Sequence, residues 1–118
     1  MEQKKDCIFC KMSSGEIQVE KIMETDNFFV IKDKFPSSEG HSLIISKKHY
    51  ENLLHFPSIL GNELIALAKD LYVQLSKETK SEGFNLVQNN FKAAGQVIPH
   101  LHFHIIPRKQ NDKVRLNQ

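Results

Sequence analysis

Hydrophobic residues in the first 46 positions fall into short clusters that polar turns separate. The clusters occupy residues 21–25, 28–32 and 41–46. Asp26-Asn27 and the Pro-, Ser- and Gly-containing segment 35–40 lie between them. This arrangement predicts a meander of antiparallel strands, because such clusters are typical of strands and such segments of turns. A short helix or turn is predicted in front of them, after Asp6, ending near residues 13–15.

A helical spacing begins at Ser58. Leucines then recur at three- and four-residue steps, at Leu60, Leu64, Leu67, Leu71 and Leu75. This spacing predicts a long amphipathic helix that ends by Gly83, just past a lysine-containing last turn. The opposite face of this helix is more apolar than a solvent-facing surface should be, with Ile65, Tyr72 and Val73. A dimer contact along the helix is therefore expected. Residues 51–54 are predicted to form one helical turn, interrupted by Pro57.

Strand patterns return after the helix. Residues 84–88 alternate between apolar and polar, a loop of small and polar residues covers 89–96, and a last strand runs over 100–106 to Pro107. The tail after Arg108 is polar and predicted to fray. Together these elements predict an α+β fold with an antiparallel sheet of about five strands, one long helix and one or two short helices. A chain of 118 residues holds one domain, 1–118, with its core at about 7–108 and a polar tail at 109–118.

Charge and composition exclude several classes of function. The net charge is +2 and the basic residues are scattered, so neither nucleic acid nor a membrane surface is an expected partner. No apolar run is long enough to span a bilayer, and the first six residues, MEQKKD, carry no apolar signal region. A soluble, cytoplasmic protein is expected.

Three histidines recur at every second position of the last predicted strand. His100, His102 and His104 therefore project from one face, and residues 101, 103 and 105 pack against the helix from the other. Three imidazoles on one face have no packing rationale, so the pattern indicates function. Neutral imidazole is a nucleophile at ambient pH and attacks phosphorus, while flanking donors bind the phosphate oxygens. The loop 93–97 can offer backbone N–H groups to the same anion.

The segment 95–108, GQVIPHLHFHIIPR, resembles the signature of the histidine triad (HIT) nucleotide-binding family. Residues 7–17, CIFCKMSSGEI, resemble the opening of that family, and residues 40–49, GHSLIISKKH, resemble its middle strand. The resemblance covers roughly residues 7–108. It implies a homodimer and a purine nucleotide substrate, with transfer of the nucleotide to His102 followed by hydrolysis of the nucleotidyl-histidine.

The resemblance also implies roles for individual residues. It places His104 on the α-phosphate, His41 in the same site, Asp33 on the ribose hydroxyls, and Asn89, Gly95, Gln96 and Val97 around the phosphate and leaving group. The apolar slot for the purine would consist of Ile8, Phe9, Met12, Ile22 and Ile31. Many members of the family have Ser or Thr where this chain has Val97, which keeps only its backbone N–H. We expect Nδ1 of His102 to donate to a backbone carbonyl, so that Nε2 faces outward.

Cys7 and Cys10 form a Cys-x-x-Cys pair that indicates a metal or redox site. Only six residues precede the pair, which disfavours a thioredoxin-like site. Zinc needs two further ligands, and His49 and His100 are the candidates. The set Cys7, Cys10, His49 and His100 resembles the zinc ligands of a branch of the superfamily that includes galactose-1-phosphate uridylyltransferase. The resemblance implies one structural Zn²⁺ per chain, so that His100 holds metal while His102 attacks.

The expected activity is hydrolysis of purine nucleoside 5′-phosphoramidates or related nucleotides, with release of a mononucleotide such as AMP. The catalytic set is His102, His104, His100 and His41. Three alternatives remain open at this point: a diadenosine polyphosphate hydrolase, a nucleotide-sensing binding module with incidental turnover, and a zinc-stabilised interaction domain.

Overall fold

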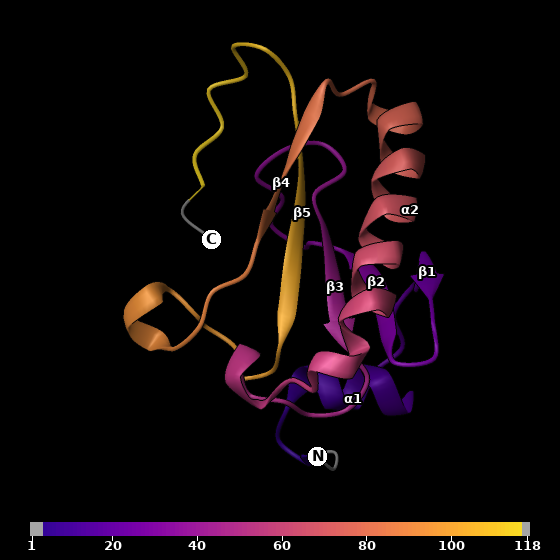
Figure 1. Ribbon diagram of the computed structural model, residues 1–118, viewed down its shortest axis with the longest axis vertical. Coiled ribbons are helices and arrows are strands. Elements are labelled where there is room, and N and C mark those ends of the chain that lie inside the picture. Colours follow the sequence, from indigo (N-terminus) through magenta and orange to yellow (C-terminus); the bar gives the residue numbers. More distant parts are fainter. Residues whose placement is uncertain (1–3, 117–118) are drawn as a thin grey trace.

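The structure is a computed structural model and describes residues 4–116. Within that range five strands form one antiparallel sheet in the order β1-β2-β3-β5-β4 (Figure 1). The strands are β1 (Met23–Glu24), β2 (Phe28–Lys32), β3 (Ser42–Ser46), β4 (Gly83–Val87) and β5 (His102–Arg108). The first three are consecutive neighbours, whereas β5 lies between β3 and β4. The predicted α+β fold and its five-stranded sheet are confirmed.

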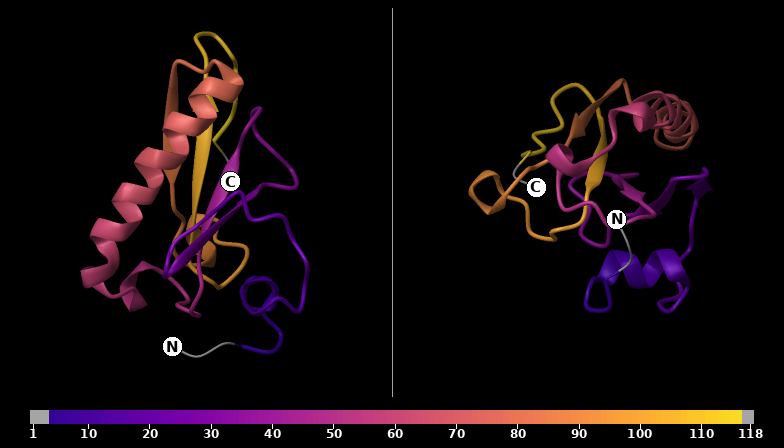
Figure 2. Two further views of the ribbon diagram at one scale, coloured as in Figure 1. Left: turned by 90° about the vertical axis from the view of Figure 1, so that its right-hand side faces the viewer. Right: turned by 60° about the horizontal axis from the view of Figure 1, so that its bottom comes forward.

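Two α-helices cover opposite faces of this sheet, as both views in Figure 2 show. They are α1 (Ile8–Ser14) and α2 (Gly61–Thr79), and single 3₁₀ turns lie at η1 (Leu53–His55), η2 (Ser58–Leu60) and η3 (Lys92–Ala94). Neither helix has both the length and the apolar character needed to cross a bilayer. The loop that contains η3 extends outward beside the ends of β4 and β5 (Figure 1).

The α2-side core lies between α2 and the sheet. The leucine stripe of the helix supplies Leu64, Leu67, Leu71 and Leu75. The last strand and the residue before it supply Leu101, Phe103 and Ile105, which confirms that these alternate residues face the helix. The period-two pattern therefore leaves the intervening residues of β5 for the other face.

The α1-side core is smaller and lies under the short helix. Its buried members are Cys7, Phe9, Cys10, Phe29, Ile31, Leu43 and Ile45. Cys7 is the N-cap residue of α1, and its sulfur accepts the N–H of Cys10. Gly15 ends the helix in a left-handed conformation with φ 87°. The helix thus places both cysteines against the sheet face that carries the histidines.

The long helix differs from its prediction at both ends. Ser58–Leu60 forms the 3₁₀ turn η2, and the α-helix begins at Gly61. Gly83 does not end the helix, because Lys80 already adopts a left-handed conformation (φ 55°) and its N–H is bonded to the Ser76 carbonyl. Gly83 is instead the first residue of β4.

The last strand also starts and ends later than predicted. β5 begins at His102, so His100 lies in the segment in front of the strand. Pro107 belongs to the strand and pairs with Phe84. The chain does not fray directly after Arg108, because the Arg108 guanidinium binds Asp112 at 2.6 and 2.8 Å. The Asp112 carboxylate also accepts the Lys109 N–H, which closes a turn.

Candidate active site and metal centre

The strand register brings two histidines of β5 beside the middle strand on the α1 side of the sheet. His104 pairs with Leu43 and His102 pairs with Ile45, and both partners belong to the α1-side core. His41 precedes Leu43 by two residues and therefore shares this face. Asp33 follows β2 and donates its N–H to the His41 carbonyl at 2.9 Å. The carboxylate and three imidazoles thus converge from three neighbouring strands.

His102 presents its unprotonated nitrogen away from the backbone. Its Nδ1 lies 2.7 Å from the carbonyl oxygen of His100. A carbonyl only accepts hydrogen bonds, so Nδ1 carries the proton and Nε2 carries the lone pair. The Phe9 ring meets the imidazole edge-on at 5.2 Å. Burial lowers the pKa of His102, so the ring is neutral at ambient pH. The expected backbone bond that turns Nε2 outward is present.

His41 has the opposite arrangement of protons. The backbone N–H of Ser37 donates to its Nδ1 at 2.9 Å, so the lone pair is on Nδ1 and the proton is on Nε2. That Nε2 lies 2.9 Å from Nδ1 of His104 and 3.3 Å from Oδ2 of Asp33. Gly40, at φ 86°, allows the loop before His41 to pack against the end of α2, because a Cβ there would lie 2.7 Å from the Thr79 methyl group.

His41 and His104 are both neutral near pH 7, because burial lowers their pKa values. Burial lowers the pKa of His41, and the Asp33 charge only partly opposes this effect. Burial, followed by the neighbouring His102 and His41, lowers the pKa of His104 to about 4. Near pH 7 the site therefore offers neutral imidazoles, whose donors and lone pairs are fixed by their partners.

The depressed pKa of His104 predicts a loss of stability in acid. The unfolded histidine titrates near 6.5, so between about pH 6.5 and pH 4 the unfolded chain binds more protons and stability falls as the pH falls. We expect His104 to cost about 2 kcal/mol of unfolding free energy between pH 7 and about pH 5. Urea unfolding at both values measures this cost, with His104→Asn as the control that lacks the titrating ring. Equal losses in both proteins would contradict the prediction.

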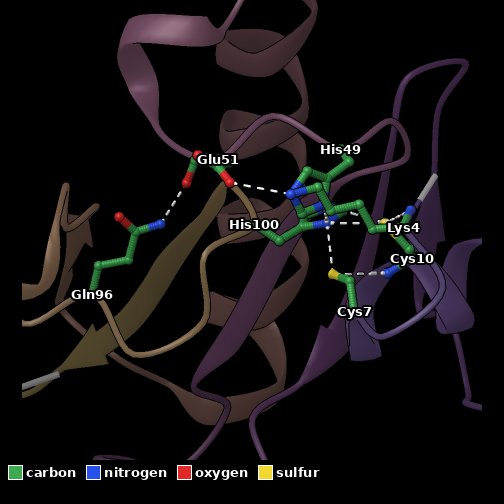
Figure 3. A network of polar contacts seen from close by, with 7 residues as sticks. All are labelled: Lys4, Cys7, Cys10, His49, Glu51, Gln96 and His100. Atoms are coloured by element: carbon green, nitrogen blue, oxygen red, sulfur yellow. Dashed lines mark hydrogen bonds and ion pairs between the residues drawn. The ribbon is translucent and has the colours of Figure 1, made fainter. Parts of the chain in front are cut away.

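The four predicted metal ligands form one buried cluster between α1 and the sheet (Figure 3). Nδ1 of His100 lies 3.2 Å from Sγ of Cys7, 3.5 Å from Sγ of Cys10 and 3.1 Å from Nδ1 of His49. Nδ1 of His49 lies 3.4 Å from Sγ of Cys10. The helix supplies the sulfurs, and the segments after β3 and before β5 supply the nitrogens.

This cluster fits a tetrahedral zinc ion. Usual Zn–N and Zn–S bonds place two nitrogens about 3.4 Å apart and a nitrogen and a sulfur about 3.6 Å apart, close to the observed separations. Nε2 of His100 bonds the Ser46 carbonyl at 2.7 Å, so the lone pair of Nδ1 is directed into the cluster. Two thiolates balance the charge of Zn²⁺ and complete a closed set of four protein ligands, as in structural sites.

A second group, Asp33, His41 and His104, has donor atoms equally close together but does not fit a metal. The Ser37 N–H occupies the lone pair of His41 Nδ1, so Nε2 carries a proton and cannot ligate. In this group a hydrogen bond of 2.9 Å joins His41 to His104, and the Asp33 carboxylate faces the same His41 proton at 3.3 Å.

The loop residues predicted around the phosphate lie beside the segment that follows β3. The side chain of Gln96 accepts the Phe91 N–H and donates to the carbonyls of Glu51 and Ile98. Its polar atoms thus clamp the loop to the segment after β3, and Figure 3 shows it directed toward Glu51. Asn89 is half-buried, Gly95 ends η3 at φ 93°, and Val97 is 87% exposed.

This loop borders a hollow of about 510 Å³. The residues around it are Glu51, Asn52, Phe91, Lys92, Gly95, Gln96, Val97 and Pro99. The N–H groups of Ala94, Gly95 and Gln96 are bonded to carbonyls within the loop itself. Contrary to the expectation for residues 93–97, these three N–H groups are therefore not offered to an anion, and the Gln96 side chain is engaged as well.

The predicted purine slot is only partly assembled. Phe9 and Ile31 are buried in the α1-side core, and Met12 packs against it. Ile8, next to Phe9, is 44% exposed. Ile22 differs from the expectation, because it packs against the α2-side core. Four of the five residues thus belong to α1 or β2, whereas the side chain of Ile22 packs on the other face of the sheet.

Sequence reasoning did not identify two residues that orient the histidines. Ser37 acts through its backbone N–H, inside a segment whose composition indicates only a loop. Ser46 acts through its carbonyl at the end of β3. Main-chain groups carry no side-chain signal, so the sequence offers nothing that would identify them.

Comparison with known proteins shows which family and which relatives the chain is similar to. Residues 14–111 match the HIT domain family. Adenylylsulfatase HINT3 of Arabidopsis thaliana is 45% identical over 107 residues, which are 91% of this chain and 54% of that protein, so the chain spans about half the length of this relative. Adenosine 5′-monophosphoramidase HNT1 of Candida albicans is 38% identical over 107 residues, 87% of this chain and 70% of that protein. The crystal structure of a Zn-bound histidine triad family protein from Mycobacterium smegmatis has a TM-score of 0.85 at 32% identity, covering 94% of this chain and 81% of that chain.

Proposed function

Because the chain belongs to the HIT domain family, we propose that it hydrolyses purine nucleotides through a covalent nucleotidyl-histidine on His102. The observation that carries this proposal is the hydrogen bond from Nδ1 of His102 to the His100 carbonyl. It leaves Nε2 with a lone pair on a neutral ring, which is the form that attacks phosphorus.

The reaction consists of two displacements. In the first, the bond between Nε2 of His102 and the α-phosphorus forms as the bond from phosphorus to the leaving group breaks. The leaving group departs with the electron pair of that bond, and an amine takes its proton from solvent. The ring becomes cationic, and the His100 carbonyl 2.7 Å from Nδ1 stabilises that charge. In the second, water attacks phosphorus and loses a proton to solvent, the P–N bond breaks with its electron pair returning to Nε2, and the mononucleotide leaves with the neutral imidazole restored. His104, on the same face, donates to a non-bridging phosphate oxygen.

The substrate class is a purine nucleoside 5′-phosphoramidate or a related nucleotide. The relative in Candida albicans named as a monophosphoramidase supports this class. Asp33 lies at the end of β2 beside the histidines, where its carboxylate can accept bonds from ribose hydroxyls. Phe9 and Ile31 supply apolar surface on the same side of the sheet.

A nucleoside phosphosulfate is a second candidate within this mechanism. The Arabidopsis thaliana relative is named as an adenylylsulfatase. Val97 is 87% exposed and has no hydroxyl with which to help protonate a leaving group. An amine needs a proton to leave, whereas sulfate leaves as a stable anion. The side chain at position 97 therefore favours leaving groups that require no proton.

A substrate comparison tests this function. Adenosine 5′-monophosphoramidate, adenosine 5′-phosphosulfate and a diadenosine polyphosphate are supplied separately, and AMP release is measured under single-turnover conditions. We expect AMP from the first two, with Val97→Ser raising the rate for the phosphoramidate more than for the phosphosulfate. If only the diadenosine polyphosphate is hydrolysed, the protein is a diadenosine polyphosphate hydrolase instead. Binding of all three without turnover would identify a sensing module.

We also propose that Cys7, Cys10, His49 and His100 hold one structural Zn²⁺ per chain. The donor distances and the burial of all four residues support this ion. So does the likeness to the Zn-bound protein from Mycobacterium smegmatis. The ion would supply a fixed anchor between α1 and the sheet, holding the His100 carbonyl that orients His102. It takes no part in either displacement.

A homodimer is proposed through β4 and α2. β4 is the last strand in the sheet order, and within residues 4–116 no other strand pairs with its outer edge, which leaves that edge open to a second copy. Phe84 and Leu86 on this strand are 40% and 49% exposed, and Ile65 and Val73 on α2 are also exposed. Tyr72 stacks on Phe84 at 4.1 Å, which joins the two elements into one apolar surface. A second copy of the chain buries this surface and pairs the edge.

Leu86→Lys is expected to convert this dimer to a monomer, because it places a charge in the centre of the surface. Light scattering after size-exclusion chromatography measures the mass of each variant. Ile59→Lys is the matched control, since Ile59 is 86% exposed and lies outside β4 and α2. A monomeric parent protein, or a dimer that survives Leu86→Lys, would contradict the proposed interface.

A further inference from the structure

We propose that the backbone N–H of Ser37 and the imidazole of His41 form a positioning relay that keeps the proton of His104 on its Nε2. The relay consists of two consecutive hydrogen bonds of 2.9 Å, from Ser37 N to His41 Nδ1 and from His41 Nε2 to His104 Nδ1. The inference rests on the proposed function, because it explains how a neutral His104 can donate a hydrogen bond to phosphate.

The direction of the relay follows from its first member. An amide N–H can only donate, so the lone pair of neutral His41 must be on Nδ1 and its proton on Nε2. That proton points at Nδ1 of His104, which therefore accepts. A neutral imidazole has one proton, and with Nδ1 accepting, the proton of His104 is on Nε2. A single main-chain group thus determines the tautomers of two side chains.

The relay is needed because a competing acceptor lies nearby. Oδ2 of Asp33 is 3.8 Å from Nδ1 of His104 and would attract a proton to that nitrogen. In that tautomer Nε2 would present a lone pair, which repels phosphate oxygens instead of binding them. The same carboxylate oxygen lies closer to Nε2 of His41, at 3.3 Å, so it stabilises the proton there. Asp33 therefore supports the relay only while His41 is present.

His41 acts through His104 and does not itself reach the substrate. Its side chain is fully buried, and both ring nitrogens are engaged by Ser37 and by His104 with Asp33. The resemblance to the HIT family places His41 in the site, and the hydrogen bonds give it the narrower role of a positioning residue.

Two substitutions at position 41 separate this role from simple packing. Glutamine places an amide donor near the position of Nε2, so His41→Gln keeps a hydrogen bond to His104 Nδ1. Leucine fills similar space without a donor. We expect His41→Leu to lower kcat about 10²-fold with little change in KM, and His41→Gln to stay within about 10-fold of the parent.

The tautomer can be read directly from ¹⁵N chemical shifts in a long-range ¹H–¹⁵N correlation spectrum of the histidine rings. The parent protein and His41→Gln are expected to show the Nε2–H form of His104, and His41→Leu the Nδ1–H form. Ser37→Pro removes the N–H that donates to His41. It is expected to move the ring protons of both His41 and His104 from Nε2 toward Nδ1, and Ser37→Ala, which keeps the N–H, is the control.

An Nδ1–H form of His104 in the parent protein would overturn the relay. So would an unchanged Nε2–H form in a folded His41→Leu variant. If His41→Leu does not fold, the spectra of the parent, His41→Gln and Ser37→Ala still decide the tautomers. The spectra require no substrate, so they test the relay even if none of the nucleotides is hydrolysed, which is the result that would defeat the proposed function.

Discussion

His102→Ala is expected to reduce kcat for nucleotide hydrolysis by at least about 10⁴-fold, because it removes the atom that bonds to phosphorus. The fold does not depend on this ring, which is only half-buried, and the carbonyl of His100 that it bonds can be hydrated in its absence. Nucleotide binding is expected to persist, since Asp33 and the apolar residues of the α1 side are unchanged. Single-turnover rates and calorimetric titration with AMP measure the two properties.

The control for this variant is His55→Ala, which removes an exposed histidine of η1 from outside the site. It is expected to leave both the rate and the affinity unchanged. If His102→Ala retains turnover within about 10-fold of the parent, the covalent route through this residue is excluded. If it also loses AMP binding, the ring serves binding as well as chemistry.

Cys10→Ser is expected to abolish zinc binding and to lower the melting temperature by about 10 °C. Serine is a poor zinc ligand, so the variant keeps only three of the four ligands that a structural zinc site needs. Burial raises the pKa of the Cys10 thiol when no cation is present, so the site favours the thiolate only together with a metal. If the bound ion contributes about 3 kcal/mol to the free energy of unfolding, its loss lowers the melting temperature of a chain of this length by about 10 °C.

Metal analysis and thermal melts of the same samples test this expectation. Protein purified without added metal should contain about one Zn²⁺ per chain, and Cys10→Ser should contain almost none. Chelation of the parent should lower its melting temperature toward that of the variant, and returning Zn²⁺ should restore the parent only. A metal-free parent with an unchanged melting temperature would rule out a structural ion.

The sequence predicted the parts of the fold that depend on periodicity. The leucine stripe identified α2 and its buried face, and alternation placed residues 101, 103 and 105 against it. Alternation also brought His102 and His104 to one face, where cross-strand pairing with Ile45 and Leu43 sets their neighbours. Spacing in Cys-x-x-Cys predicted one half of the metal cluster, because residues i and i+3 at a helix start lie close together.

Features that depend on main-chain hydrogen bonds were not predictable in the same way. The period-two pattern includes His100, but β5 begins two residues later. The His100 ring instead bonds the Ser46 carbonyl and contacts the sulfurs of the two cysteines. Glycine marks a favourable helix end, but Lys80 takes the left-handed position first. The Ser37 amide bond to His41 joins atoms whose roles only the folded loop defines.

The covalent route is tested most directly by the stereochemistry at the α-phosphorus. An adenosine substrate made chiral at that atom by sulfur and an oxygen isotope is hydrolysed in isotopically labelled water, and the configuration of the product is determined. Each in-line displacement inverts phosphorus, so attack by His102 followed by attack by water predicts net retention. Net inversion would show a single displacement by water and would contradict the nucleotidyl-histidine.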